Sequence, residues 1–232
     1  MITPGDIISY IEMCRAEGAS LQRGMNFRLG GRESVILMSL RKGAPYADRI
    51  EDNGKTLIYE GHDVSKRKGG PAPKKADQPR ALPSGKLTQN GIFFDAAMRT
   101  KRGELQPERV KVYEKIKDGI WAYDGIFELK DAWQEKSRGR RVFKFKLRLT
   151  EDFSLANEGG AARELAHDRL IPSSVKIDVW KRDSGKCVQC GSTDNLHFDH
   201  IIPYSQGGSS LVAENIQLLC ARHNLQKSDK II

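Results

Sequence analysis

Hydrophobic and polar positions divide the chain into two parts. Up to about residue 150, short apolar runs and alternating stretches are typical of strands. These stretches cover residues 34–40, 56–59, 110–113 and 142–149. Helices are expected over residues 7–15 and over residues 88–98, where Thr88 is a capping residue. The pattern therefore predicts an α+β fold in which residues 1–150 are mostly strands with flanking helices.

The strand pattern ends after residue 150. Glu158-Gly-Gly160 interrupts the chain before a run of good helix formers, and we interpret residues 151–172 as a linker. A short helix over residues 175–182 opens a second domain, residues 173–232. Within the first domain, residues 63–86 are rich in Lys, Gly and Pro and predict a mobile basic loop.

The positive charge of the chain indicates which class of molecule it binds. The 232 residues carry a net charge of +9, and the basic residues cluster along the sequence. The clusters include Lys66-Arg67-Lys68, Lys74-Lys75 and Arg138-Gly-Arg140-Arg141. Such clusters suit a polyanion, most often nucleic acid, although a merely solvated basic surface is the alternative. No apolar run approaches the ~20 residues of a membrane span, so no membrane partner is expected.

Cysteine spacing predicts a structural metal site. Cys187-Val-Gln-Cys190 and Cys220-Ala-Arg-His223 form two ligand pairs with two-residue spacers, and a tetrahedral zinc ion needs four such ligands. A disulfide or buried free thiols are the alternatives. The opening residues, Met1-Ile-Thr-Pro-Gly-Asp6, hold breakers and an acid where a signal peptide needs an apolar core. We therefore expect a reducing compartment, which favours zinc.

The residues around these ligands resemble the HNH (ββα-metal) endonuclease superfamily over roughly residues 172–230. The matched stretches are Val179-Trp-Lys-Arg-Asp183, Cys187-x2-Cys190-Gly191, Asp199-His200-Ile-Ile-Pro203, Gly207-Gly208, Glu214-Asn215-Ile-Gln-Leu-Leu-Cys220 and His223-Asn224-x2-Lys227. The resemblance implies a small nuclease domain stapled by zinc, with a separate divalent ion at its catalytic centre.

The family pattern assigns the catalytic roles. His200 is the expected general base, since histidine accepts a proton near neutral pH. Asp199 and Asn224 are the expected ligands of a catalytic Mg²⁺ or Mn²⁺. Many members carry His where Asn224 stands, so the chain resembles an H-N-N variant. Asn215 is expected to orient His200, and His197 to contact phosphate or to stabilise the hairpin.

Residues 20–150 resemble the SRA (SET- and RING-associated, or YDG) domain, which implies a PUA-like curved β-barrel. The supporting pieces are Gly30-Gly-Arg32, Tyr46-Ala-Asp48, Asp52-Asn-Gly54, Tyr59-Glu-Gly61-His62, Lys86-Leu-Thr88-x-Asn90, Trp121-Ala-Tyr123-Asp124-Gly125-Ile126-Phe127 and Trp133-Gln-Glu135. SRA domains bind DNA and flip a modified cytosine into a pocket. Tyr123-Asp124-Gly125 is expected to be a structural turn outside that pocket.

The resemblance also suggests which residues bind the base. Tyr46 and Tyr59 match the positions that stack on it, and Asp48 would accept a hydrogen bond from the exocyclic N4 amine. Glu60 stands where many members have a Thr that contacts the base. The tyrosines could instead be core aromatics, and Asp48 could pair with Arg49 or Lys55. The basic residues Lys66, Arg67, Lys68, Lys74 and Lys75 are expected to grip DNA.

Together, the two resemblances imply a type IV-like restriction endonuclease in a bacterial cytoplasm. It would flip 5-methylcytosine or 5-hydroxymethylcytosine from double-stranded DNA and hydrolyse nearby phosphodiester bonds. One HNH centre cuts one strand, so a double-strand break requires a homodimer or two independent nicks. Two alternatives stay open: an HNH nuclease whose N-terminal domain reads unmodified DNA, and a noncatalytic reader of modified DNA.

Overall fold

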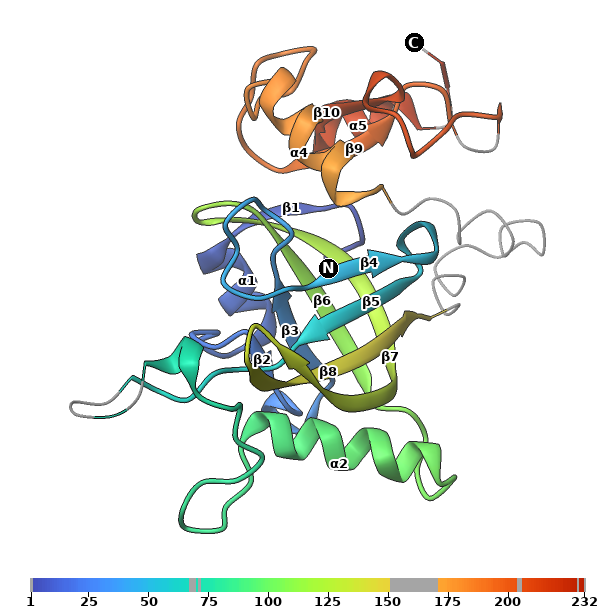
Figure 1. The fold of residues 1–232 in the computed structure, drawn as a ribbon. Coiled ribbons are helices and arrows are strands. Elements are labelled where there is room, and N and C mark those ends of the chain that lie inside the picture. Colours follow the sequence, from blue (N-terminus) through green and yellow to red (C-terminus); the bar gives the residue numbers. More distant parts are fainter. Residues whose placement is uncertain are drawn as a thin grey trace.

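The computed structural model describes residues 2–66, 70, 72–150, 171–203, 206–228 and 230–231. The expected linker, residues 151–172, lies almost entirely outside these ranges, and so do Arg67 and Lys68. Figure 1 shows a strongly curved sheet at the centre, with the C-terminal elements at one end and one long helix at the other.

A mixed eight-stranded sheet forms the first domain. Its strands are β1 (Ile7–Ser9), β2 (Met25–Asn26), β3 (Ser34–Met38), β4 (Arg49–Glu51), β5 (Thr56–Glu60), β6 (Arg109–Lys117), β7 (Ile120–Ser137) and β8 (Arg140–Leu149). The order is β2-β3-β6-β7-β8-β5-β4, with β1 paired to β7. Only the β3–β6 pair is parallel among the described strands. The expected strand-rich, curved domain is confirmed.

Two helices flank this sheet. Ser9 and Glu12 form a capping box at the start of α1 (Tyr10–Glu17). Thr88 caps α2 (Gln89–Lys101), as its sequence predicts. The buried face of α2, with Phe93 and Ala97, packs into the main apolar core beneath the sheet. Three short 3-10 turns, Leu29–Gly31, Asp52–Gly54 and Pro73–Lys75, connect the elements.

Two local expectations are wrong. Residues 7–9 form strand β1, so the first helix begins only at Tyr10. Tyr123-Asp124-Gly125 is not a turn but lies within the long strand β7. Its partner β6 pairs Val112 with Gly125 and Tyr113 with Tyr123, so Asp124 is the extra residue of a β-bulge. Gly125 has a φ of 105°, which explains why the stretch resembles a turn in sequence.

The C-terminal region is a ββα unit preceded by a helix, α4 (Ser173–Arg182). Strands β9 (Leu196–His200) and β10 (Ile216–Cys220) form an antiparallel hairpin, and α5 (Ala221–Lys227) follows directly. A 3-10 turn, Ala213–Asn215, leads into β10. This arrangement confirms the expected ββα architecture. Within the described ranges, no helix combines the length and apolarity needed to span a membrane.

Candidate nuclease site and base pocket

The four expected zinc ligands meet at one point. The ligand atoms of Cys187, Cys190, Cys220 and His223 all lie within 4.8 Å of one another. The Cys190 and Cys220 sulfurs are 3.9 Å apart, and His223 Nδ1 lies 3.3 Å from Cys187 Sγ and 3.5 Å from Cys220 Sγ. Three thiols and one imidazole at these separations fit tetrahedral zinc.

Local structure prepares these ligands. Cys220 ends β10, and His223 lies one turn further on, in α5. Burial opposes ionisation of the Cys187 thiol, but hydrogen bonds from the Cys220 backbone and from His223 outweigh burial and lower its pKa to about 6. Because zinc binds the thiolate, this environment favours metal binding at neutral pH. None of the four cysteines is in a disulfide.

The expected general base lies at the end of β9. His200 Nε2 is 2.8 Å from the hydroxyl of the buried Ser210, which holds the imidazole ring in place. Asp199 precedes it on the same strand, opposite Gln217 of β10, whose side-chain amide donates to Asp199 Oδ2 over 3.0 Å. Asp199 and His200 thus lie at the end of β9.

Lys227 connects this strand to α5. Its buried ammonium lies 3.1 Å from Asp199 Oδ2 and donates to the backbone carbonyl of His200 over 2.6 Å. Asn224 is one turn earlier on the same helix. Asp199 and Asn224 therefore offer oxygen donors from β9 and α5, a donor type suited to Mg²⁺ or Mn²⁺.

Asn215 fixes the loop that follows His200. Its side-chain oxygen accepts from the Ile202 amide over 2.8 Å, and its nitrogen donates to the carbonyls of Ile202 and Ser209, each over 3.0 Å. A side chain at Gly208 would come within 1.8 Å of the Ile202 carbonyl oxygen, so the loop closes only with glycine there. Asn215 thus acts on His200 indirectly, through the loop that carries Ser210.

Three of the four expected base-pocket residues line an open cavity of about 1460 Å³ in the first domain. Tyr46, Asp48 and Tyr59 line it, together with His62. The His62 ring stacks on Tyr46, with centroids 5.7 Å apart, and its Nε2 lies 3.2 Å from the Tyr59 hydroxyl. Tyr59 is also part of the main core, so this residue both lines the cavity and packs in the core.

Asp48 is held by backbone amides rather than by a neighbouring cation. Its carboxylate accepts from the Glu60 amide over 2.9 Å and from the Ser39 amide over 3.3 Å. The alternative pairing with Arg49 is not formed, because Arg49 pairs with Glu51. Burial raises the pKa of Asp48 to about 7, against the stabilising effect of these amides. Burial also lowers the pKa of His62, to about 4, so its ring is neutral at pH 7.

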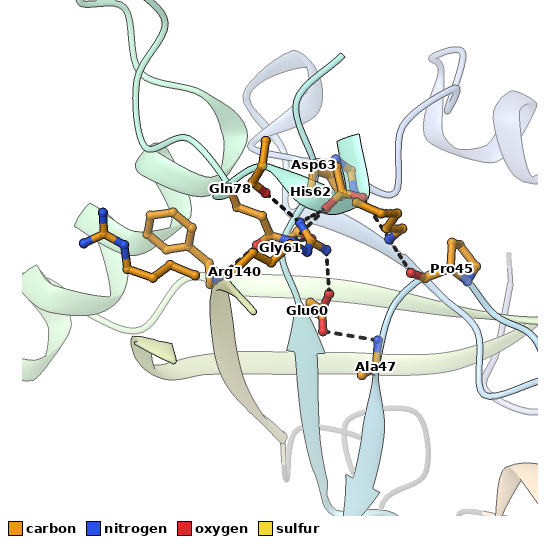
Figure 2. A network of polar contacts seen from close by, with 12 residues as sticks. Pro45, Ala47, Glu60, Gly61, His62, Asp63, Gln78 and Arg140 are labelled. Carbon is orange, nitrogen blue, oxygen red and sulfur yellow. Dashed lines mark hydrogen bonds and ion pairs between the residues drawn. The ribbon is translucent and has the colours of Figure 1, made fainter. Parts of the chain in front are cut away.

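The structure does not place Glu60 among the described residues that line the cavity. Successive strand residues point to opposite faces, so Tyr59 and Glu60 cannot share one. The Glu60 carboxylate is buried, 2.9 Å from Lys144 Nζ and 3.4 Å from Arg140. Figure 2 shows the Arg140 part of this network, in which Arg140 contacts both Glu60 and Asp63. Its geometry indicates a structural role for Glu60.

The expected DNA-gripping lysines differ in their surroundings. Lys66 and Lys75 are exposed, whereas the Lys74 ammonium lies 2.8 Å from Asp63 and 4.0 Å from the centre of the Tyr46 ring. Lys74 also contacts the Pro45 carbonyl. Lys74 thus packs against two residues at the rim of the cavity, Tyr46 and Asp63. Arg67 and Lys68 lie outside the described residues.

Four residues that contact the expected site residues have no role predicted from the sequence. Ser210, Gln217 and Lys227 contact His200 or Asp199, and His62 contacts both pocket tyrosines. His62, Gln217 and Lys227 stand inside matched stretches, which is the one signal that the sequence offers. The roles of Ser210 and Gln217 depend on loop closure and strand register.

Comparison with known families matches both regions. The SAD/SRA domain model covers residues 2–152, and the HNH endonuclease model covers residues 187–230. Among curated proteins, the Arabidopsis thaliana H3 lysine-9 methyltransferase SUVH1 is 34% identical over 106 residues, which are 44% of this chain and 14% of SUVH1. SUVH6 of the same plant is 27% identical over 131 residues, 55% of this chain and 16% of SUVH6. The chain thus matches only a small part of these relatives.

Similar solved structures include SRA domains in complex with DNA. The SUVH5 SRA domain in complex with hemi-methylated CG DNA is 26% identical, with a TM-score of 0.43, over 64% of this chain and 89% of that one. The same domain bound to fully hydroxymethylated CG DNA is 25% identical, with a TM-score of 0.40, over 61% and 84%. Because the SAD/SRA model spans well over half of the residues, the chain belongs to the SAD/SRA domain family, and it carries an HNH endonuclease domain at its C-terminal end.

Proposed function

We propose that the chain is a modification-dependent DNA endonuclease. The observation that carries this proposal is the presence, in one chain, of an SRA cavity lined by Tyr46, Asp48 and Tyr59 and an HNH hairpin bearing Asp199 and His200. A reader without a nuclease would not need Asp199 and His200 beside a Cys3His cluster. A nuclease without a reader would not need an aromatic cavity.

In the reading step, the first domain takes a modified cytosine out of the duplex and into the cavity. An extruded base loses its stacking neighbours, and the two tyrosine rings replace them. Asp48 faces the Watson–Crick edge of the base, while His62 supports both rings. Glu60 keeps its structural partners, so discrimination between modifications falls to residues on the cavity side of β5.

In the cutting step, His200 removes a proton from a water molecule whose oxygen attacks the phosphorus. The bond from phosphorus to the leaving oxygen breaks, and that oxygen takes a proton from solvent water. Ser210 and the Asn215-closed loop keep the imidazole in position. Asp199 and Asn224 would hold a Mg²⁺ or Mn²⁺ ion, which supplies charge stabilisation at the phosphate. Cys187, Cys190, Cys220 and His223 would hold the structural zinc.

Digestion of matched duplexes tests this function. The duplexes carry cytosine, 5-methylcytosine, 5-hydroxymethylcytosine or its glucosylated form at one position, in Mg²⁺ or Mn²⁺. We expect strand cleavage only where the base is modified, and the preferred modification identifies the substrate. Equal cleavage of all four duplexes would favour an HNH nuclease that reads unmodified DNA, and no cleavage in either metal would favour a noncatalytic reader.

A further inference from the structure

Helix α4, which opens the nuclease region, docks on the central strands of the reader. Lys176 of α4 inserts its ammonium between two carboxylates of the sheet, 2.5 Å from Asp124 Oδ1 on β7 and 3.1 Å from Glu114 Oε2 on β6. The three side chains are 4%, 2% and 0% exposed, respectively. The contact is therefore a fully buried ion cluster that joins the two regions.

The bulge in β7 supplies one of these carboxylates. Asp124 is the extra residue between the pairs Val112–Gly125 and Tyr113–Tyr123, and it is the residue that meets Lys176. A bulge re-aims a side chain relative to the regular alternation of a strand. The Tyr-Asp-Gly stretch thus forms the docking point of the nuclease region, outside the base pocket.

Apolar side chains surround the ion cluster. One continuous buried group contains Ile7, Ile116 and Ala122 of the reader and Val175, Val179 and Phe198 of the nuclease region. The apolar contacts favour association in general, whereas a buried ammonium tolerates only orientations that keep its carboxylates within reach. The combination therefore selects one orientation of the nuclease on the reader.

The catalytic strand is tied to the reader at a second point. His197 Nδ1 lies 2.8 Å from Asp6 Oδ1, and the two residues form an isolated antiparallel bridge. Asp6 immediately precedes β1, which pairs with β7. Because His197 stands two residues before Asp199 on β9, this contact acts on the strand that carries the candidate catalytic residues. Figure 1 shows β9 above β1 at this end of the sheet.

We infer that Lys176 is a positioning residue that locks the nuclease onto the reader, so that DNA is cut at one set offset from the flipped base. The inference rests on the proposed function. A nuclease on a loose tether would instead reach many phosphates, because the accessible positions would follow the length of the tether. In the docked arrangement, the distance from the cavity to His200 is fixed by the fold.

Mapping of cut positions tests the inference. A long duplex with a single modified cytosine is digested by the full chain, and the ends are read at nucleotide resolution. We expect wild type to give one dominant position on the cut strand. Lys176→Met removes the charge, and Lys176→Glu adds a third carboxylate to the cluster; both should spread the cuts over many positions. Lys181→Met and Lys181→Glu are matched controls, since Lys181 is an exposed lysine of the same helix, and should cut as wild type does.

Affinity for the modified duplex and bound zinc show whether the variants keep both regions folded. Folded Lys176 variants that retain the single wild-type position would overturn the inference. Scattered cuts by wild type would overturn it without any variant, as long as cutting still depends on the modification. Loss of that dependence would instead count against the proposed function, so the two failures are distinguishable.

Discussion

At the scale of single residues, His200 separates cutting from reading. Replacing His200 with Ala removes the proposed general base, so nicking should fall by roughly 10²–10⁴-fold. The base cavity lies in the other domain, so the affinity for modified DNA should be unchanged. Nicking and equilibrium binding are measured on the same duplex. Undiminished cutting by His200→Ala would rule out its catalytic role.

The pKa of Asp48 leads to a second prediction, that the affinity for modified DNA depends on pH. A neutral cytosine offers an N4 donor and an N3 acceptor, so a protonated carboxyl group satisfies both, whereas a carboxylate opposes N3. The pKa of Asp48 in the unbound protein is raised to about 7. Above this pH the Asp48 carboxyl group of the unbound protein is ionised, so DNA binding that prefers the protonated form must be accompanied by uptake of a proton. The Kd for modified DNA should therefore be flat below about pH 7 and rise by up to ~tenfold per pH unit above it.

The Asp48→Asn variant is the control for this profile. An amide presents a donor and an acceptor at every pH, so the Kd of this variant should not change across the range. Fluorescence anisotropy from pH 5.5 to pH 8.5 measures both proteins. A wild-type profile without a break near pH 7, or the same break in Asp48→Asn, would exclude Asp48 as the titrating contact.

At the scale of elements, the hairpin β9–β10 and helix α5 depend on the Cys3His cluster. The unit is small and its core is shared with α4, so metal binding is expected to supply much of its folding free energy. Cys190→Ala should therefore lose zinc and nicking while retaining affinity for modified DNA. Cys14→Ala is the matched control, because Cys14 lies outside the cluster, and it should keep all three.

Zinc content is measured by metal analysis, and local order by hydrogen exchange over residues 187–228. The expected result is faster exchange in Cys190→Ala than in Cys14→Ala, confined to this region. A Cys190→Ala protein with wild-type zinc content would show that the cluster is not the metal site.

Sequence pattern predicted the elements well where local signals act. Apolar runs located β3 and β5, an alternating stretch located β8, and Thr88 located the start of α2. The sequence pattern failed where the conformation of a residue depends on a partner strand far away in the sequence. Residues 7–9 form a strand because β7 offers them an edge, and Asp124 lies in a bulge because β6 pairs around it.

The same distinction holds for the sites. The Cys3His cluster could be predicted because its four ligands are paired at fixed spacings, and the structure brings them together. Ser210 could not, because its contact with His200 needs the loop that Asn215 closes. Glu60 was expected to face the base, but the alternation of β5 turns it toward Lys144 and Arg140.

At the scale of the whole molecule, the SRA domain and the HNH domain share one buried interface. The cavity holds the tyrosine rings that we propose select a base, and the hairpin holds the residues that we propose cut a strand. The buried Lys176 cluster connects them, so recognition and cleavage are expected to occur on the same DNA molecule.

The most direct test is a competition in one tube. Two duplexes of identical sequence, one with the preferred modified cytosine and one with cytosine, carry different fluorophores and are mixed in equal amounts. We expect the modified duplex to be nicked about fourfold faster or more, since burial of one extra methyl-sized group is worth about 0.8 kcal/mol. Equal initial nicking rates for the two duplexes would contradict it.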